Sequence, residues 1–134
     1  MSNLYSIGYQ GRTIEQFIAL LRKYNVNVIV ECRAIPYSKY NEAFNWDNLK
    51  KHSEFVYVND VSLGNDGYFN YKDIDYIISK PYNGYAFMCM ETDPTKCHRS
   101  TMIGKYLLNN IGIDVQHITT NGSILKQSEI NLLF

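Results

Sequence analysis

Short apolar segments alternate with amphipathic ones along the chain, and this alternation constrains the fold more than any other feature. Five segments are short, apolar and rich in β-branched or aromatic residues, which is typical of strands. They cover residues 4–9, 26–30, 55–58, 85–90 and 115–118. Because helical patterns separate them, we predict an α/β fold: a mostly parallel five-stranded sheet with helices on both faces, in a Rossmann-like three-layer arrangement.

The amphipathic segments carry helix signals. The apolar face of the first consists of Ile14, Phe17, Ile18 and Leu21. Thr13 followed by Gln16 has the spacing of a capping box. Asn45 is predicted to cap a short helix that runs to Lys51, and Gly112 to adopt the left-handed conformation that ends a later helix. Two further faces are predicted to point inward: Ile74, Ile77 and Ile78, and Met102, Ile103, Tyr106 and Leu107.

Length and composition indicate an ordinary globular protein. The chain has 134 residues, of which 46% are hydrophobic and 19% charged, and this favours a single domain over residues 1–134. Thirteen basic and thirteen acidic residues give zero net charge, so nucleic-acid binding is disfavoured and anion recognition must be local. No apolar stretch approaches the roughly 20 residues of a membrane helix. Three cysteines without tandem spacing favour reduced thiols, and we expect a cytoplasmic protein without membrane association.

The predicted strand ends deliver an unusually polar set of side chains. In open α/β sheets, ligands bind beyond the carboxyl ends of the strands. The candidates there are Gly8, Tyr9, Arg12, Glu31, Arg33, Glu91, Cys97, His98, Arg99 and Ser100. Three of the four arginines belong to this set, and their planar guanidinium groups suit a carboxylate or a phosphate. The alternative is a structural network in which Arg33 and Arg99 pair with Glu31 and Glu91.

The segment Cys97-His98-Arg99-Ser100 stands at the predicted start of a helix. The N–H groups and the dipole of a first helical turn favour a bound anion and stabilise a thiolate, which makes Cys97 a candidate nucleophile. The alternative is an ordinary helix cap with Arg99 in solvent. Cys97 and Arg99 lie too close in sequence for a cysteine-phosphatase or rhodanese loop, so that mechanism is not carried over.

No metal or cofactor is predicted. Cys89, Cys97 and His98 are good zinc ligands, but structural zinc sites usually have four ligands in tight pairs, so a zinc site is the less favoured alternative. Cys32 and Cys89 are predicted to be small buried side chains. Four tyrosines are predicted in loops near the crevice, where a ring can stack on a base: Tyr9, Tyr37, Tyr40 and Tyr68.

Several of these residues also carry a family resemblance. The pattern comprises Ile7-Gly8-Tyr9 with Arg12-Thr13, Glu31-Cys32-Arg33 with Pro36, Asn45, and Cys89-x-Glu91-x-Asp93-Pro94-x-x-Cys97-His98-Arg99-Ser100. With it the chain resembles the family catalogued as domain of unknown function 488, from the first strand to about His117. That family usually has Asp-Val-Arg where this chain has Glu-Cys-Arg, and often a longer insertion after Leu63-Gly64. The resemblance implies an α/β fold, the same clustered site and a context of nucleotide or nucleic-acid metabolism, without an established activity.

The first functional hypothesis is a small enzyme acting on a phosphorylated, nucleotide-like substrate. The residues expected to bind the ligand are Gly8, Tyr9, Arg12, Arg33, Arg99 and Ser100, with the arginines on the anion. The residues expected in catalysis are Glu31 or Glu91 as general acid or base, assisted by Cys97 and His98.

Two other functions compete with this hypothesis. The first is a non-catalytic module that binds a nucleotide or a signalling ligand. The second is a nucleic-acid-associated protein, which the zero net charge disfavours. A homodimer is a further option, because the chain ends in the apolar residues Leu132, Leu133 and Phe134.

Overall fold

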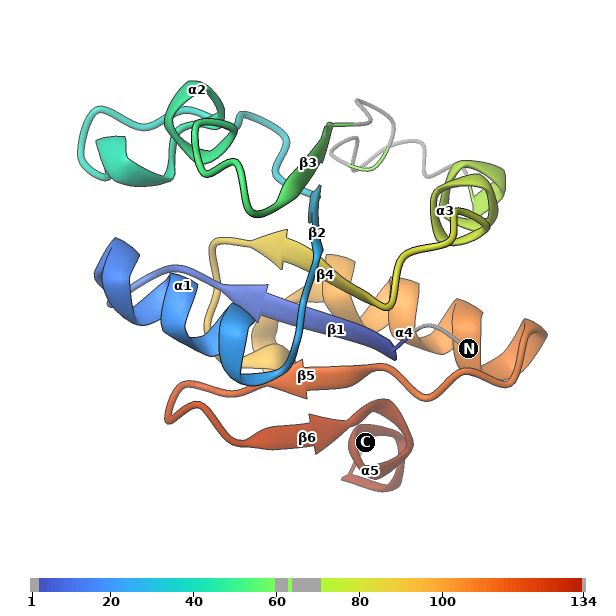
Figure 1. Cartoon of the computed structure of the whole chain (residues 1–134). Coiled ribbons are helices and arrows are strands. Elements are labelled where there is room, and N and C mark those ends of the chain that lie inside the picture. Colours follow the sequence, from blue (N-terminus) through green and yellow to red (C-terminus); the bar gives the residue numbers. More distant parts are fainter. Residues whose placement is uncertain (1–2, 60–62, 64–70, 134) are drawn as a thin grey trace.

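Six strands form one sheet in the order β3-β2-β4-β1-β5-β6 (Figure 1). The computed structural model describes residues 3–59, 63 and 71–133, with the backbone alone for residues 98–100 and 133. The strands are β1 (Asn3–Gly8), β2 (Val28–Glu31), β3 (Val56–Asn59), β4 (Gly84–Cys89), β5 (Gln116–Ile118) and β6 (Ile124–Lys126). All neighbouring strands pair in parallel except β5 and β6. The predicted mostly parallel sheet is confirmed.

The sheet has one strand more than the predicted five, because β6 adds an antiparallel edge. This strand has three residues and follows a turn in which Gly122 adopts a φ of 85°. A segment of three residues is too short to show the alternation that identifies a strand in a sequence. The prediction of five strands is therefore wrong by one short edge strand.

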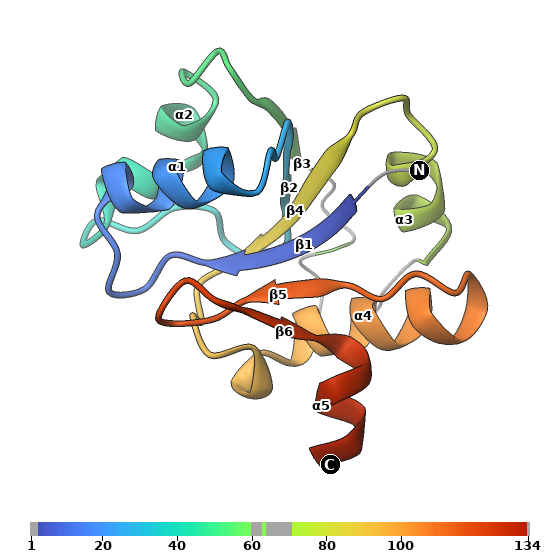
Figure 2. The ribbon, with the colours of Figure 1, turned by 60° about the horizontal axis from the view of Figure 1, so that its bottom comes forward.

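Helices cover both faces of the sheet, which confirms the three-layer arrangement (Figure 2). The helices are α1 (Ile14–Lys23), α2 (Trp46–Leu49), α3 (Tyr71–Ile78), α4 (His98–Asn110) and α5 (Gln127–Leu133), with 3-10 turns η1 (Glu42–Phe44) and η3 (Pro94–Lys96). One apolar cluster joins α1, η1 and α2 to one face, and a second joins α3 and α4 to the other. Within the described ranges, no helix combines the length and the apolar character needed to span a bilayer.

The first helix forms as its sequence predicts. The hydroxyl of Thr13 accepts a hydrogen bond from the Gln16 backbone N–H, and the Gln16 side chain accepts one from the Thr13 N–H, so the capping box is complete. Phe17, Ile18 and Leu21 are buried in the cluster under α1. This packing fixes α1 beside the carboxyl end of β1.

Two predicted helix positions behave differently from expectation. Asn45 precedes α2, but its Oδ1 accepts a hydrogen bond from the Ser38 N–H at 2.6 Å, so the predicted side-chain cap is wrong. The loop after β2 uses this amide to fold back on itself. Met102 is exposed on α4, whereas Ile103 and Leu107 are buried, because α4 rests on the sheet through a narrower stripe than predicted.

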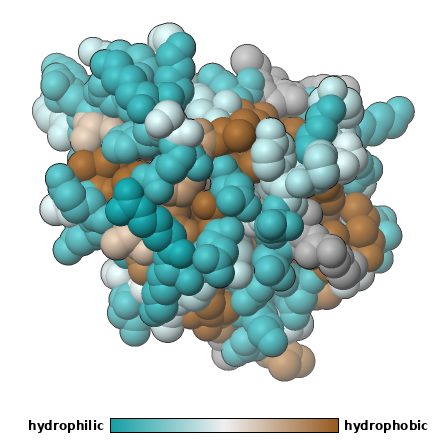
Figure 3. Space-filling view, viewed as in Figure 1, coloured by the Kyte–Doolittle hydropathy of each residue, from teal (hydrophilic) through white to brown (hydrophobic). Residues whose placement is uncertain are grey.

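The C-terminal part of the chain agrees with the sequence-based predictions only in places. Gly112 follows α4 with a φ of 77°, as predicted for a left-handed helix end. Leu132 is exposed on α5, while the side chains of Leu133 and Phe134 lie outside the described part. On the face seen in Figure 3, apolar areas lie scattered among hydrophilic side chains. The homodimer stays a prediction.

A buried polar network joins β1, β5 and α5. The hydroxyl of Ser6 lies 2.5 Å from Nδ1 of His117, and Nε2 of His117 lies 2.7 Å from Oε1 of Gln127. Since an amide oxygen only accepts, Nε2 carries the proton and Nδ1 accepts from Ser6. Gly104 of α4 leaves room for this amide, because a Cβ there would lie 2.1 Å from Oε1 of Gln127.

We expect the stability of the fold to depend on His117 at mildly acidic pH. Burial lowers the pKa of His117 below its ordinary value of 6.5, against opposing effects of Gln127 and Asp114. As the pH falls below 6.5, the unfolded chain takes up a proton that the folded chain refuses, which costs about 1.4 kcal/mol for each pH unit until the lowered pKa is reached.

Urea unfolding across this pH range, on the wild type and on His117→Gln, measures the effect. The variant lacks the titrating ring, so its free energy of unfolding should fall less on acidification. Equal losses in the two proteins would contradict a buried neutral His117.

Candidate functional site

The carboxyl ends of β1 and β4 lie at the edge of the sheet where the sequence predicts a ligand crevice. These strands are neighbours in parallel register, with Ile7 opposite Met88. The helix after β1 packs on one face of the sheet, and the helix after β4 packs on the other. Adjacent strands whose following helices lie on opposite faces form the usual binding crevice of an open α/β sheet. Both arrowheads point to this edge, on the left of Figure 1.

Backbone contact between the loops after β1 and β4 closes the base of this crevice. The N–H of Gln10 donates to the Met90 carbonyl at 2.9 Å, which extends the strand pairing. A Cβ at Gly8 would lie 1.9 Å from the carbonyl oxygen of Glu91, so a larger residue requires the backbone to move. Gly8, a predicted ligand contact, therefore lies packed against the loop after β4.

Glu31 and Arg33 form a buried ion pair at the end of β2. Only 1% of Glu31 and 8% of Arg33 are exposed. The guanidinium donates through Nη2 to Oε1 of Glu31 at 2.6 Å and through Nε to Oε2 at 2.9 Å. The backbone N–H of Arg33 donates to Oε2 at 3.2 Å, and the hydroxyl of Tyr57 donates to Oε1 at 2.6 Å. Both carboxylate oxygens are thus satisfied, as a buried charge requires.

Arg33 also contacts the segment that follows β2 and the aromatic ring that follows β1. Its Nη2 donates to the carbonyl of Phe44 at 2.7 Å, and its Cζ lies 5.1 Å from the ring centroid of Tyr9. Burial by itself lowers the pKa of Arg33, but hydrogen bonding and charge attraction from Glu31, with a contribution from Tyr9, raise it overall. Burial, followed by the same carboxylate, raises the pKa of Tyr57. Arg33 is therefore charged and Tyr57 protonated at neutral pH.

A pocket of about 370 Å³ lies beside Arg33 and Tyr9, and we call it the edge pocket. Its lining residues are Tyr9, Arg33, Ala34, Ile35, Tyr37, Ser38, Tyr40, Asn41 and Met90. None of these is acidic, and Lys39 places its Nζ 5.2 Å from the ring centroid of Tyr40. Tyr37 and Tyr40 are 58% and 82% exposed. The edge pocket thus combines accessible aromatic rings with one lining guanidinium, that of Arg33, and Lys39 lies beside Tyr40. Tyr68 lies outside the described residues.

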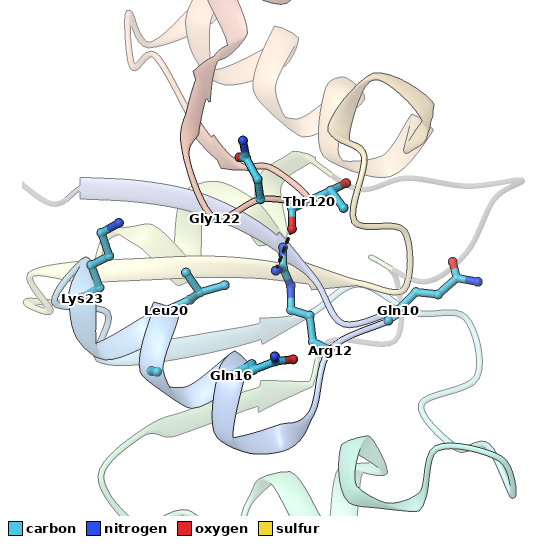
Figure 4. Close-up of a pocket in the computed structure, with 10 residues that line it drawn as sticks. Gln10, Arg12, Gln16, Leu20, Lys23, Thr120 and Gly122 are labelled. Carbon is cyan, nitrogen blue, oxygen red and sulfur yellow. Dashed lines mark hydrogen bonds between the residues drawn. The ribbon is translucent and has the colours of Figure 1, made fainter.

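Arg12 lines a different pocket, of about 490 Å³, between α1 and the β5–β6 turn (Figure 4). Its Nε donates to the Gly8 carbonyl at 2.9 Å. Its Nη2 and Nη1 donate to the carbonyls of Thr119 and Thr120 at 2.8 and 3.3 Å. Burial lowers the pKa of Arg12. Arg12 therefore fastens the β5–β6 turn to the end of β1, and it is not among the described residues that line the edge pocket.

The segment Cys97-His98-Arg99-Ser100 begins α4, as predicted. Cys97 occupies the N-cap position without a side-chain cap hydrogen bond, and the hydroxyl of Thr101 donates to its carbonyl at 3.1 Å. The side chains of His98, Arg99 and Ser100 lie outside the described part, so their roles stay predictions.

Two of the predicted thiols come together beneath this segment. Cys89 and Cys97 are both buried, as is Cys32, and none of the three forms a disulfide. The sulfur atoms of Cys89 and Cys97 lie 3.2 Å apart. The described side chains include no group of three histidine, cysteine or acidic residues able to hold a metal ion.

Glu91 differs from Glu31 in its surroundings. It is half-buried, and its Oε1 accepts a hydrogen bond from the Asp93 N–H at 2.9 Å. Neither of the two salt bridges among the described side chains involves it. Of the two predicted catalytic carboxylates, Glu91 is the one that keeps acceptor capacity and water access beside the crevice.

Sequence reasoning missed two residues that shape this site. Tyr57 belonged to an apolar predicted strand, and only the pairing of β3 with β2 brings its hydroxyl to Glu31. Phe44 could not be recognised from the sequence, because it acts through its backbone carbonyl, which accepts from Arg33, and through its ring, which stacks on Tyr9 with 4.7 Å between the ring centroids. A tyrosine in an apolar strand beside a strand that ends in Glu-x-Arg is the signal that was available.

We expect Glu31→Gln to lower the free energy of unfolding by about 3 kcal/mol, because it leaves the Arg33 guanidinium buried without an opposite charge. Chemical denaturation measures the loss. The matched control is Glu54→Gln, which breaks the exposed Arg22–Glu54 pair with the same atom change, and it should alter stability little. Similar losses in both variants would contradict a structural ion pair at the end of β2.

We also expect Gly8→Ala to destabilise the fold by about 3 kcal/mol, because the added methyl group collides with the Glu91 backbone. Gly11→Ala is the control. Gly11 has a φ of 78° and open space around its Cβ position, so the substitution should cost about 1 kcal/mol of backbone strain alone. If thermal unfolding ranks the two variants in the opposite order, the close approach at Gly8 is refuted.

Comparison of the chain with protein-family models, with curated proteins and with solved structures gave no significant match.

Proposed function

We propose that this protein binds a small phosphorylated, nucleotide-like ligand in the edge pocket. The observation that carries the proposal is that Arg33 and the exposed rings of Tyr37 and Tyr40 line one pocket with no acidic residue. An aromatic face stacks on a base, and a guanidinium donates in a fixed geometry to phosphate oxygens. The two halves of a nucleotide match these two features.

The attraction for the anion is directional and does not rest on net charge. Glu31 compensates the charge of Arg33, so the pair is neutral as a unit. The hydrogen bonds to Glu31 and Phe44 use Nε and Nη2, and Tyr9 also interacts with the guanidinium, so the donor capacity that remains for a ligand lies on Nη1. Lys39 adds a cation beside Tyr40, where a flexible ammonium group can reach a phosphate.

The dimensions of the edge pocket agree with this ligand class. Its volume of about 370 Å³ lies within the range of roughly 300 to 1,000 Å³ that small-molecule sites occupy. Arg12 is assigned to fold structure in this proposal, because three backbone carbonyls already engage its guanidinium. Arg99 stays a proposed second cation for the ligand.

A catalytic role is the second candidate, and Glu91 is the observation that favours it. A half-buried carboxylate next to the crevice can accept a proton from water or from a substrate hydroxyl. Glu31 is less suited to that role, since its oxygens already accept four hydrogen bonds. The resemblance to domain of unknown function 488 remains a proposal and supports the same sheet edge.

We expect nucleoside mono-, di- or triphosphates to raise the melting temperature of the protein, and Tyr40→Ala to weaken their binding about tenfold. The expected factor follows from the loss of one stacked ring, about 1 to 3 kcal/mol. Thermal shift identifies the ligand, and calorimetry on the wild type and the variant gives the affinities.

Tyr76→Ala is the matched control, because Tyr76 is 65% exposed on α3 and does not line the edge pocket. The affinity of this variant for the ligand should equal that of the wild type.

The ligands incubated with the protein are then analysed for products. Turnover that Glu91→Gln abolishes supports an enzyme, and recovery of intact ligand supports a binding module. Failure of every phosphorylated compound to bind would refute both.

A further inference from the structure

The geometry points to Cys89 and Cys97 as a dithiol that a peroxide converts reversibly into a disulfide. This modification is independent of the proposed ligand. It rests on the placement of two sulfur atoms that belong to different elements, the last residue of β4 and the N-cap of α4.

The two sulfur atoms are already close to bonding distance. Sγ of Cys97 lies 3.2 Å from Sγ of Cys89, and a disulfide bond is about 2.0 Å long, so the sulfurs must approach by about 1.2 Å. We expect rotation about the side-chain torsions of both cysteines to supply this approach. The segment between them, residues 90–96, contains a 3-10 turn and two buried residues, Thr92 and Pro94.

The position of Cys97 suits it for the first attack. It stands at the N-terminus of a helix of 13 residues, where the helix dipole favours the thiolate. The solvent-exposed fraction of Cys97 is 8%, compared with 5% for Cys89. Cys89 lies behind it with its sulfur 3.4 Å from the Glu91 carbonyl oxygen, and it acts as the resolving thiol.

The chemistry balances with hydrogen peroxide as the oxidant. The Cys97 thiolate attacks one peroxide oxygen and the O–O bond breaks. A sulfenic acid forms on Cys97, and the departing hydroxide becomes water with the proton that the Cys97 thiol has lost. The Cys89 thiolate then attacks that sulfur, forms the S–S bond and displaces a second water. Two thiols have lost two electrons and two protons, and a dithiol reductant reverses the step.

Cys32 provides an internal comparison within the same protein. Its N–H donates to the Met88 carbonyl, so it follows β2 directly beside the end of β4. It is as buried as the other two cysteines. Because the sulfur atoms of Cys89 and Cys97 lie only 3.2 Å apart, the bond should form between them and leave the Cys32 thiol intact.

The test oxidises the folded protein with hydrogen peroxide, blocks remaining thiols and digests with trypsin. Lys96 lies between the two cysteines, so the expected product is the tripeptide Cys97-His98-Arg99 linked to the peptide that ends at Lys96. The intact mass should fall by two hydrogen atoms, and dithiothreitol should restore it. Cys97→Ser and Cys89→Ser should lose the link, while Cys32→Ser should keep it.

A second measurement separates a native pair from random oxidation. The link should form faster in the folded protein than in urea, where the three thiols compete, and it should raise the melting temperature because it restricts the unfolded chain. A bond from Cys32, or overoxidation of Cys97 without any bond, would overturn the inference. If a serine variant does not fold, the wild-type peptide map decides the matter alone.

Discussion

Removal of the Arg33 guanidinium from water is the constraint on which the carboxyl edge of the sheet depends. A buried cation requires an opposite charge and acceptors for its hydrogen atoms, and here Glu31 and the Phe44 carbonyl supply them. Glu31 in turn holds the hydroxyl of Tyr57, and Tyr9 covers the guanidinium. One ion pair therefore links the carboxyl ends of β1, β2 and β3 and the loop after β2. The segments that follow β1, β2 and β4 form the walls of the edge pocket.

The architecture followed from the sequence because its signals are local and repeated. The strand Val28–Glu31 is short and begins with three β-branched apolar residues, and the segment Ile14–Lys23 has both a periodic apolar face and a capping box. Both elements can therefore be identified from the sequence. Strand order is a different kind of information. The placement of β4 between β1 and β2 depends on which crossovers bury the most apolar surface, and no single segment records it. For the same reason β6, with three residues, went unnoticed.

The candidate site was predictable in its location but not in its contacts. Chain position alone placed Arg12 and Arg33 at one edge, yet Arg12 turns to the backbone of residues 119 and 120, and Arg33 turns to Glu31. The direction of a long side chain depends on which acceptors its neighbours leave unsatisfied, and those neighbours come from distant segments. The proximity of Cys89 and Cys97 has the same origin, because the turn at residues 91–96 decides it.

Arg12 holds the β5–β6 turn through carbonyl oxygens, and every amino acid carries that acceptor. The contact with Arg12 therefore does not depend on which side chains stand at positions 119 and 120, as long as the path of the backbone is kept. Position 12 has no such freedom, since lysine cannot serve three acceptors with a planar fork. The contact thus depends on the identity of one residue, Arg12, and on the backbone shape of its partner, the β5–β6 turn.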